Sequence, residues 1–212
     1  MPYFSDNKFS DYEINLLIAY CTVFSCLAVS PYYFLTWLVE NVTVWLYLLL
    51  IIIMRLKHFR FSKIALFVVF LACCFHTIGG HFSFQLVPFG EYLTIFGPDG
   101  RNNFDRLGHF VCGLQAYPLI EYITKRKIIV SQYTAFLFSV LALEGIAGIY
   151  ELIEWLDVII AEKRFGEIYI GTQGDPWDAQ ADMLNCFIGA IFSCFLFIAM
   201  KKLKKQTFAK QS

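Results

Sequence analysis

Six long apolar stretches, separated by shorter polar segments, dominate the pattern of the chain. A helix needs about 20 residues to cross the roughly 30 Å hydrocarbon core of a bilayer. The pattern therefore predicts an all-α fold, a polytopic membrane helix bundle of about six transmembrane helices in a single integral membrane domain, residues 1–212. The predicted spans are 14–30, 36–54, 64–80, 107–123, 128–155 and 178–200.

Two of these spans are less apolar than the others. Glu40 and Asn41 occupy the first turns of the second span, and Gln115, Pro118 and Glu121 interrupt the fourth. Polar side chains at membrane depth favour the interior of a bundle over the lipid. We therefore expect the fourth span to be surrounded by other helices.

Loop charge orients the predicted bundle. The net charge is zero, but thirteen of the seventeen Lys and Arg residues lie at one set of span ends. The positive-inside rule places that set, together with both termini, in the cytoplasm. The other ends carry the remaining four, which are Arg101, Arg106, Lys163 and Arg164.

The longest connections, 82–104 and 156–174, both fall on the predicted outer side. The first contains turn signals at Pro88-Phe89-Gly90 and at Gly97-Pro98-Asp99-Gly100. Its aromatic residues suit a segment lying against lipid headgroups. In the second connection, residues 167–172 are expected to form a short extended piece.

Three carboxylates, Asp175, Asp178 and Asp182, lie at the start of the last span. At 100° per residue they fall within about 60° of one another on a helix. A carboxylate at bilayer depth costs roughly 2.5–3.5 kcal/mol, so the group needs a partner. Asp175 before Pro176 is suited to capping the helix, whereas Asp182 is too deep to cap it. For Asp182, a structural ion pair is the alternative to a functional role.

The topology brings acids and histidines of four consecutive spans to the same outer level. About eight acids face at most two arginines there, so either several carboxylates are protonated or cations bind among them. Simpler roles as caps, ion pairs, interfacial acids or a hydrogen-bonded core histidine remain open for individual residues. The residues are His76, His81, Asp105, His109, Glu144, Glu151, Glu154 and the three aspartates.

Carboxylates and imidazoles on facing helices are a ligand set for one or two divalent metal ions. All seven cysteines lie within spans, none at this level, which disfavours a closed structural zinc site. For catalysis, Glu144 or His81 is the candidate general base, and Arg106 or Arg101 is the candidate phosphate ligand. The expected metal ligands are Asp105, His109, Glu151, Glu154, Asp178 and Asp182.

Several other activities lack their sequence signals. The chain has no Walker loop, no Gly-x-Ser-x-Gly elbow, no His-Glu-x-x-His motif and no basic aromatic groove, so we expect no nucleic-acid partner. Glycines within the spans are expected to allow close helix packing. They are Gly79, Gly80, Gly108, Gly113, Gly145, Gly148 and Gly189.

Three blocks of sequence resemble the signature blocks of the bacterial YjdF family of small polytopic inner-membrane proteins. The resemblance implies a location in the bacterial cytoplasmic membrane and a six-helix architecture. It assigns no catalytic role to any residue of this chain. The blocks are Asn103-Phe104-Asp105-Arg106-Leu107-Gly108-His109-Phe110, Tyr150-Glu151-Leu152-Ile153-Glu154-Trp155 and Gly174-Asp175-Pro176-Trp177-Asp178-Ala179-Gln180-Ala181-Asp182-Met183.

Three functions remain open. The first is a metal-dependent hydrolase or transferase that acts on a lipid or lipid-linked substrate at the outer leaflet. The second is an ion or small-solute transporter that uses the same acids, although the inner halves of the third and sixth spans are apolar. The third is a structural membrane protein whose acids only cap helices and form ion pairs.

Overall fold

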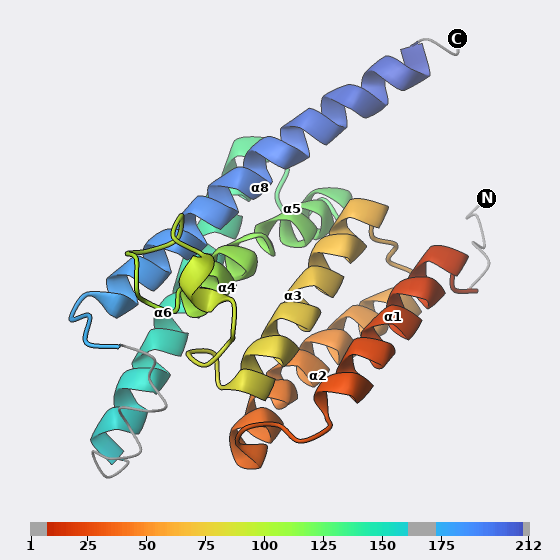
Figure 1. Cartoon of the computed structure of the whole chain (residues 1–212). Coiled ribbons are helices and arrows are strands. Elements are labelled where there is room, and N and C mark those ends of the chain that lie inside the picture. The colour runs from red at the N-terminus through yellow and green to blue at the C-terminus, as the bar shows by residue number, and fades with distance from the viewer. Residues whose placement is uncertain (1–7, 161–172, 210–212) are drawn as a thin grey trace. The chain divides into compact units, whose positions relative to one another are not determined.

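The computed structural model describes residues 8–160 and 173–209 of the chain, and within these ranges the regular structure is entirely helical (Figure 1). The all-α prediction is confirmed. Lys163, Arg164 and the expected extended piece 167–172 lie outside the described residues. The helices are α1 (Asp11–Leu27), α2 (Phe34–Leu56), α3 (Lys63–Phe82), the short η1 (Gly90–Tyr92), α4 (Phe104–Gly113), α5 (Ala116–Lys125), α6 (Gln132–Ile160) and α8 (Asp178–Ala209).

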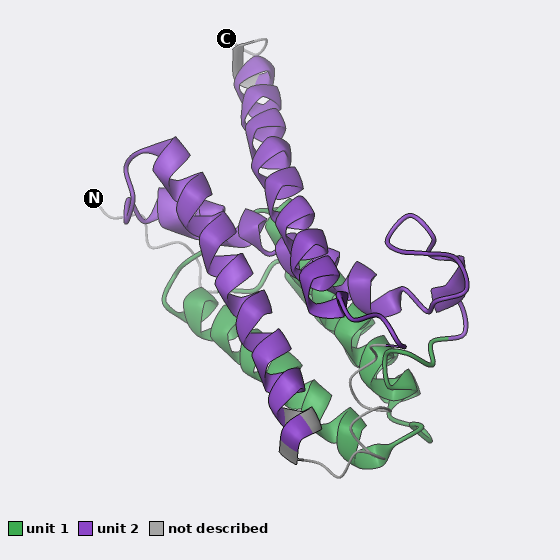
Figure 2. Ribbon diagram, turned by 90° about the vertical axis from the view of Figure 1, so that its left-hand side faces the viewer, with its two compact units in different colours: residues 1–87 green, residues 88–212 purple. Residues whose placement is uncertain are grey.

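The chain divides into two compact units (Figure 2). Unit 1, residues 1–87, contains α1, α2 and α3, and unit 2, residues 88–212, contains the other helices. Each unit is described by itself below. The single integral domain expected from the sequence stays a prediction.

Four of the described helices are long and apolar enough to cross a membrane. They are α2, α3, the stretch Gln132–Leu156 of α6 and the stretch Asp178–Thr207 of α8, with mean hydropathies of 1.8 to 2.2. Helix α1 forms where the first span was predicted and has 17 residues, at the short end of what can span. The multi-pass helical architecture is therefore confirmed.

The fourth predicted span differs from expectation, because it is broken into two helices of 10 residues each. Pro118 lies in the first turn of α5, where a missing N–H costs nothing. At the break, the Gln115 side chain donates to the carbonyl of Val111 (3.1 Å), and the Ser193 hydroxyl of α8 donates to that of Leu114 (2.9 Å). Irregular backbone at membrane depth is tolerated when protein side chains satisfy it in this way.

Unit 1 is a three-helix arrangement in which α1 and α2 both pack on α3. Ser10 and Glu13 form a capping box at the start of α1, and the Ser62 side chain accepts a hydrogen bond from Ala65 N–H at the start of α3. The apolar core of the unit consists of Tyr20, Val44, Val69 and Cys73.

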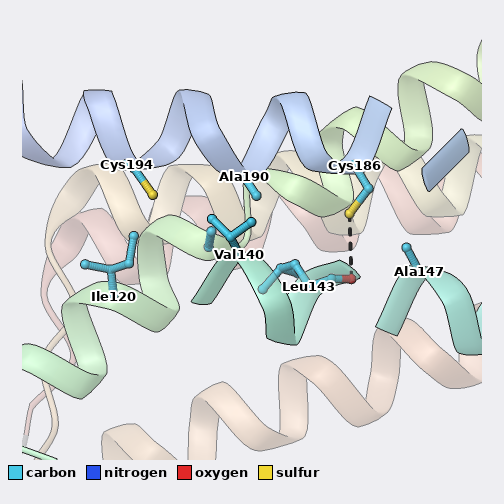
Figure 3. Packing of buried hydrophobic residues seen from close by; sticks show 8 residues of the cluster. Ile120, Val140, Leu143, Ala147, Cys186, Ala190 and Cys194 are labelled. Carbon is cyan, nitrogen blue, oxygen red and sulfur yellow. Dashed lines mark hydrogen bonds between the residues drawn. The ribbon is translucent and has the colours of Figure 1, made fainter. Parts of the chain in front are cut away.

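Unit 2 is built around α8, which packs against α4, α5 and α6. Small side chains on α8 allow α5 and α6 to approach it closely, and the Cys186 thiol lies 3.7 Å from the carbonyl oxygen of Leu143 on α6 (Figure 3). The buried cluster comprises Ala116, Ile120, Val140, Leu143, Ala147, Cys186, Ala190 and Cys194.

Two glycines bring the backbones of α4 and α8 into contact. A Cβ at Gly113 would lie 2.0 Å from the carbonyl oxygen of Cys186, and one at Gly189 would lie 2.2 Å from that of Phe110. Close packing is therefore confirmed for these two positions, whereas a Cβ at Gly145 would meet no atom of the described residues within 4 Å. Because Gly189 follows Asp182 by two helical turns, this contact fixes where Asp182 lies along α4.

Candidate functional site

Asp105 and His109 are presented by the first turns of α4. They are i, i+4 neighbours on a buried face, with exposures of 9% and 6%. The start of the helix is fixed because Phe104 N–H donates to the Asn102 side chain (3.2 Å) and the Phe104 ring packs against Phe89. The two side chains therefore have a well-supported position at the N-terminal end of α4.

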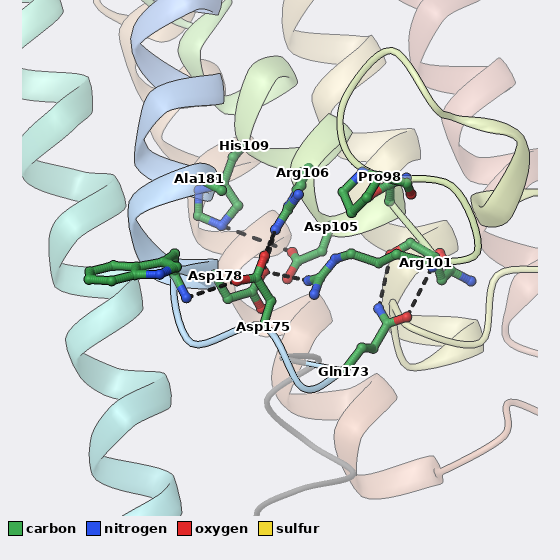
Figure 4. A network of polar contacts seen from close by, with 12 residues as sticks. Pro98, Arg101, Asp105, Arg106, His109, Gln173, Asp175, Asp178 and Ala181 are labelled. Atoms are coloured by element: carbon green, nitrogen blue, oxygen red, sulfur yellow. Dashed lines mark hydrogen bonds and ion pairs between the residues drawn. The ribbon is translucent and has the colours of Figure 1, made fainter.

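The loop before α4 is tied to the segment before α8. Gln173 forms a reciprocal pair of hydrogen bonds with Asn102, both 2.9 Å long, through the backbone N–H and carbonyl of Asn102 (Figure 4). Gly90 fits tightly against the Asn102 side chain, since a Cβ there would lie 1.7 Å from its Oδ1. These contacts position Arg101 beside the start of α8.

Two buried arginines pair with the acids at the start of α8 (Figure 4). Arg101 contacts Asp178, and Arg106 Nη2 lies 2.5 Å from Asp175 Oδ2 and 3.3 Å from Asp178 Oδ1. Charge-assisted hydrogen bonds of this kind offset the desolvation of buried carboxylates. Asp178 thus has two cationic partners, and these ion pairs account for its burial without a bound metal ion.

Asp175 orders the turn that precedes α8, three residues before the helix begins at Asp178, and its predicted role as the helix cap stays a prediction. Its Oδ1 accepts a hydrogen bond from the backbone N–H of Trp177 at 2.9 Å. This hydrogen bond and the Arg106 guanidinium together hold the pKa of the Asp175 carboxyl below its ordinary value. Asp175 is the more exposed partner of Arg106, with 27% of its side chain accessible.

Asp105, His109 and Asp182 form a buried group with metal-ligand chemistry. Each offers one ligand atom, and these three atoms lie within 4.8 Å of one another. His109 Nε2 is 4.0 Å from Asp105 Oδ1 and 3.0 Å from Oε1 of Glu151 on α6. Four of the six predicted metal ligands therefore come together from three helices.

Asp182 has a side-chain oxygen with no hydrogen-bond partner among the described residues. The residue is only 2% exposed, and this oxygen, Oδ1, is itself buried. His109 Nδ1 has the same status in that part of the chain. A buried polar atom left unpaired costs about 1–3 kcal/mol, and more when it is charged. Two such atoms within the group of Asp105, His109 and Asp182 single out this group as the candidate site.

The remaining predicted site residues lie elsewhere. Glu144 is in the middle of α6, and its Oε1 is buried without a hydrogen-bond partner in the described ranges, whereas Glu154 lies near the C-terminal end of that helix. Neither belongs to the group of three. His81 is in unit 1, where its Nδ1 lies 2.7 Å from the carbonyl oxygen of Leu27. The roles assigned to Glu144, Glu154 and His81 stay predictions.

Unit 1 contains a second polar network that sequence reasoning did not assemble. His76 Nε2 lies 2.9 Å from the buried Glu40 and 3.1 Å from the Thr43 hydroxyl, and Thr77 donates to Asn41 at 3.0 Å. The sequence does contain a signal for this network, because the second and third spans each carry two consecutive polar residues, Glu40-Asn41 and His76-Thr77. From the sequence alone, Glu40 and Asn41 indicate a less apolar second span, and nothing in the pattern shows that they are partners of the third.

Comparison with known proteins decides the family. Residues 12–203 match the family described as "Predicted membrane protein (DUF2238)". The chain belongs to the DUF2238 family. The inner membrane protein YjdF of Escherichia coli (strain K12) is 32% identical over 167 residues, which cover 78% of each chain. No solved structure matches the chain.

The resemblance to the YjdF family is therefore confirmed. Every residue of the buried cluster and both of its arginines lie within the part of the chain that matches DUF2238. Membership establishes a membrane protein and does not by itself assign a reaction.

Proposed function

We propose that this DUF2238 protein binds a divalent cation between Asp105, His109 and Asp182 and uses it to hydrolyse or transfer a lipid or lipid-linked substrate. The proposal places it in the bacterial inner membrane, with both termini cytoplasmic and the site at the outer face. The observation that carries it is the buried Oδ1 of Asp182, which has no hydrogen-bond partner in the described part of the chain and lies within a group of metal-ligating atoms.

Charge balance supports a cation. Arg101 and Arg106 are engaged by Asp175 and Asp178. Two further carboxylates, on Glu151 and Asp182, then face the imidazole of His109. Even a protonated imidazole offsets only one of these two charges, and uncompensated buried charge is strongly unfavourable. A divalent ion with a neutral imidazole offsets both.

The spacing of the ligand atoms is close to what an ion requires. Two ligand atoms that each lie about 2.1 Å from a metal ion are at most about 4.2 Å apart. The observed upper limit is 4.8 Å, so binding would draw the side chains inwards by several tenths of an ångström. Rotation of a carboxylate about its terminal torsion, which is soft, supplies that movement.

The chemistry of the ligand atoms limits which metal ions suit the site. One imidazole with carboxylates and no thiolate favours zinc, iron or manganese over a purely oxygen-bound calcium site. Glu151, 3.0 Å from His109 Nε2, can be a fourth ligand or can orient the imidazole.

The position along α8 supports an outer-face site. Asp178 and Asp182 lie at the beginning of this helix, and Lys201, Lys202 and Lys204 lie near its end. By the positive-inside rule the lysine end is cytoplasmic, which places the carboxylate end at the outer leaflet. A lipid or lipid-linked substrate can approach this level from the bilayer.

The chain's own residues supply the other parts of such a reaction. A bound divalent cation polarises a phosphoryl or acyl oxygen and acidifies an attacking water. Arg106 can donate hydrogen bonds to a substrate phosphate. The phosphate would take the place of the Asp175 carboxylate, which is the more exposed partner of Arg106. Glu144 is the candidate base on α6, since its Oε1 has no hydrogen-bond partner within the described residues.

Transport ranks below this proposal. A pathway would need polar groups that continue along the bundle. Two of the available side chains are engaged with their own helices, because Asn185 donates to the carbonyl of Ala181 and Gln115 donates to that of Val111. Cation uptake into liposomes that disappears in Glu144→Gln would reverse this ranking.

The activity is tested with purified full-length protein and two substrate classes, a phosphatidate and a polyprenyl diphosphate. We expect phosphate release or transfer that stops on chelation, returns with Mn²⁺ or Zn²⁺, and is lost in Asp182→Asn. Asp99→Asn is the control, because that acid is exposed and lies outside the group of three. Metal-independent turnover, undiminished turnover in Asp182→Asn, or no turnover of either class contradicts the proposed reaction.

A further inference from the structure

Unit 1 contains a cavity that the proposed function does not use. Its volume is about 560 Å³, and apolar side chains of α1, α2 and α3 line most of it, among them Leu17, Ile51 and Val69. This volume lies within the range of about 300–1,000 Å³ that is usual for small-ligand sites. The lining matches a hydrocarbon chain rather than a polar solute.

A second, more polar cavity of about 300 Å³ shares part of its wall with the first. The two share Glu13, Phe61 and Leu66 in their walls, and the polar cavity adds Arg60 and Lys63. The whole site is therefore amphipathic, with a long apolar part and a short charged part. A phospholipid has the same division.

The charge of the combined walls is positive. Four basic side chains line them, against the two acids Asp11 and Glu13. Glu13 is already paired with Arg55, whose Nε lies 2.8 Å from its Oε1. The basic side chains are Lys8, Arg55, Arg60 and Lys63.

Local contacts hold the charged end in place. Arg55 is only 5% exposed and donates from Nη2 to the backbone carbonyl of Lys8 at 2.7 Å. The Tyr12 hydroxyl donates to the carbonyl of Lys63, and the Lys63 ammonium lies 5.4 Å from the centre of the Tyr12 ring. The wall that carries Lys63 is therefore fixed by the first turn of α1, so less ordering is needed when a ligand binds.

We infer that these two cavities form a binding site for an anionic phospholipid, with an acyl chain among Leu17, Ile51 and Val69 and the phosphate at Arg60 and Lys63. Charge complementarity selects an anionic over a zwitterionic headgroup, because each basic residue near a membrane surface attracts anionic lipid. The site lies in unit 1 and is independent of the metal cluster in unit 2, so either proposal can fail without the other.

Native mass spectrometry of the full-length protein in mild detergent tests the inference, with phosphatidylglycerol and phosphatidylcholine of the same acyl chains as probes. We expect at least a fivefold preference for phosphatidylglycerol in the wild type. The double variant Arg60→Gln/Lys63→Gln should bind the two lipids equally, and Lys204→Gln/Lys205→Gln at the far end of α8 should keep the preference. Cavity filling by Leu17→Trp, or independently by Ile51→Trp, should reduce binding of both lipids.

Equal binding of the two lipids by the wild type overturns the inference, as does an equal loss in the Lys204/Lys205 control. Displacement of phosphatidylglycerol by millimolar inorganic phosphate would identify a free-anion site instead. A protein dimer that carries no lipid adduct would identify a second copy of the chain as the occupant. Thermal unfolding of each variant confirms that it is folded, and two cavity-filling positions keep the test decisive if one variant is unstable.

Discussion

His109 Nε2 on α4 lies 3.0 Å from Glu151 Oε1 on α6, so one contact joins two helices of the candidate site. Residues that orient a metal-bound imidazole typically contribute 10–100-fold to metal affinity. We therefore predict that Glu151→Gln weakens metal binding by about 10–100-fold, whereas Glu154→Gln, one turn further along α6, leaves it within about twofold. Competition with a chromogenic chelator in detergent measures both, and equal affinities in the two variants would contradict the assignment.

Substitution by Ala should affect stability in opposite ways at two glycines, Gly189 at the contact between α4 and α8 and Gly145 on α6. Ala is intrinsically favoured over Gly in a helix by up to about 1 kcal/mol. At Gly189 the new Cβ would lie 2.2 Å from a backbone oxygen, which cannot move aside as a flexible side chain can. We expect Gly189→Ala to lower the free energy of unfolding by about 1–3 kcal/mol. Gly145→Ala, in open space, should leave it unchanged or raise it.

Thermal unfolding of the detergent-solubilised protein distinguishes the two glycine variants. A melting temperature that falls in Gly189→Ala and holds in Gly145→Ala is the expected pair of results. Equal shifts at both positions would mean that the backbone contact does not set the position of α8.

Because Arg101 and Asp178 form a buried pair, substitutions at the two positions should lower the free energy of unfolding non-additively. Removing one partner of a buried ion pair costs about 3–5 kcal/mol, and the remaining contact of Asp178 with Arg106 favours the lower end for Arg101→Gln. The double variant Arg101→Gln/Asp178→Asn should cost less than the sum of the single variants, because the contact between the two residues is lost in each single variant and is counted twice in that sum. Unfolding free energies measure the difference, with the exposed Lys204→Gln as a neutral control. Strict additivity would contradict the pairing.

The lowered pKa of Asp175 predicts a stability contribution that disappears in acid. A carboxyl whose folded pKa lies below its unfolded value of about 3.9 stabilises the fold above that pH and loses this effect as pH falls through the folded value. The effect should be small, because the side chain is partly exposed. The melting temperature of Asp175→Asn should therefore lie a few degrees below wild type near pH 7, with the gap closing below about pH 4. A gap that does not narrow as the pH falls below about 4 would contradict this.

Much of the candidate site follows from periodicity and from the cost of burying charge. The spacing of Asp178 and Asp182 predicted a shared face at the start of the last span, and both are buried in the structure. The i, i+4 spacing of Asp105 and His109 predicted one face of the fourth span, and both lie next to Asp182. Helical spacing was sufficient here because each pair belongs to one helix.

Contacts between helices were harder to predict. Arg101 reaches Asp178 only because Gln173 and the tight fit at Gly90 hold its loop, and neither contact has a periodic signal. Glu40 and His76 are each polar positions within a predicted span, but their pairing depends on the register between α2 and α3, which helical periodicity does not reveal. The break after α4 shows the same limit, since Ser193 of α8 satisfies the carbonyl that the break exposes.

Elemental analysis of the purified full-length protein tests the central claim most directly. Protein from cells supplied with zinc, manganese and iron is compared with Asp182→Asn and with the control Asp175→Asn, after thermal unfolding confirms that all three are folded. The proposed site predicts about one divalent ion per chain in wild type and in Asp175→Asn, and a near-complete loss in Asp182→Asn. Folded wild-type protein without stoichiometric metal, or equal metal in Asp182→Asn, would contradict it.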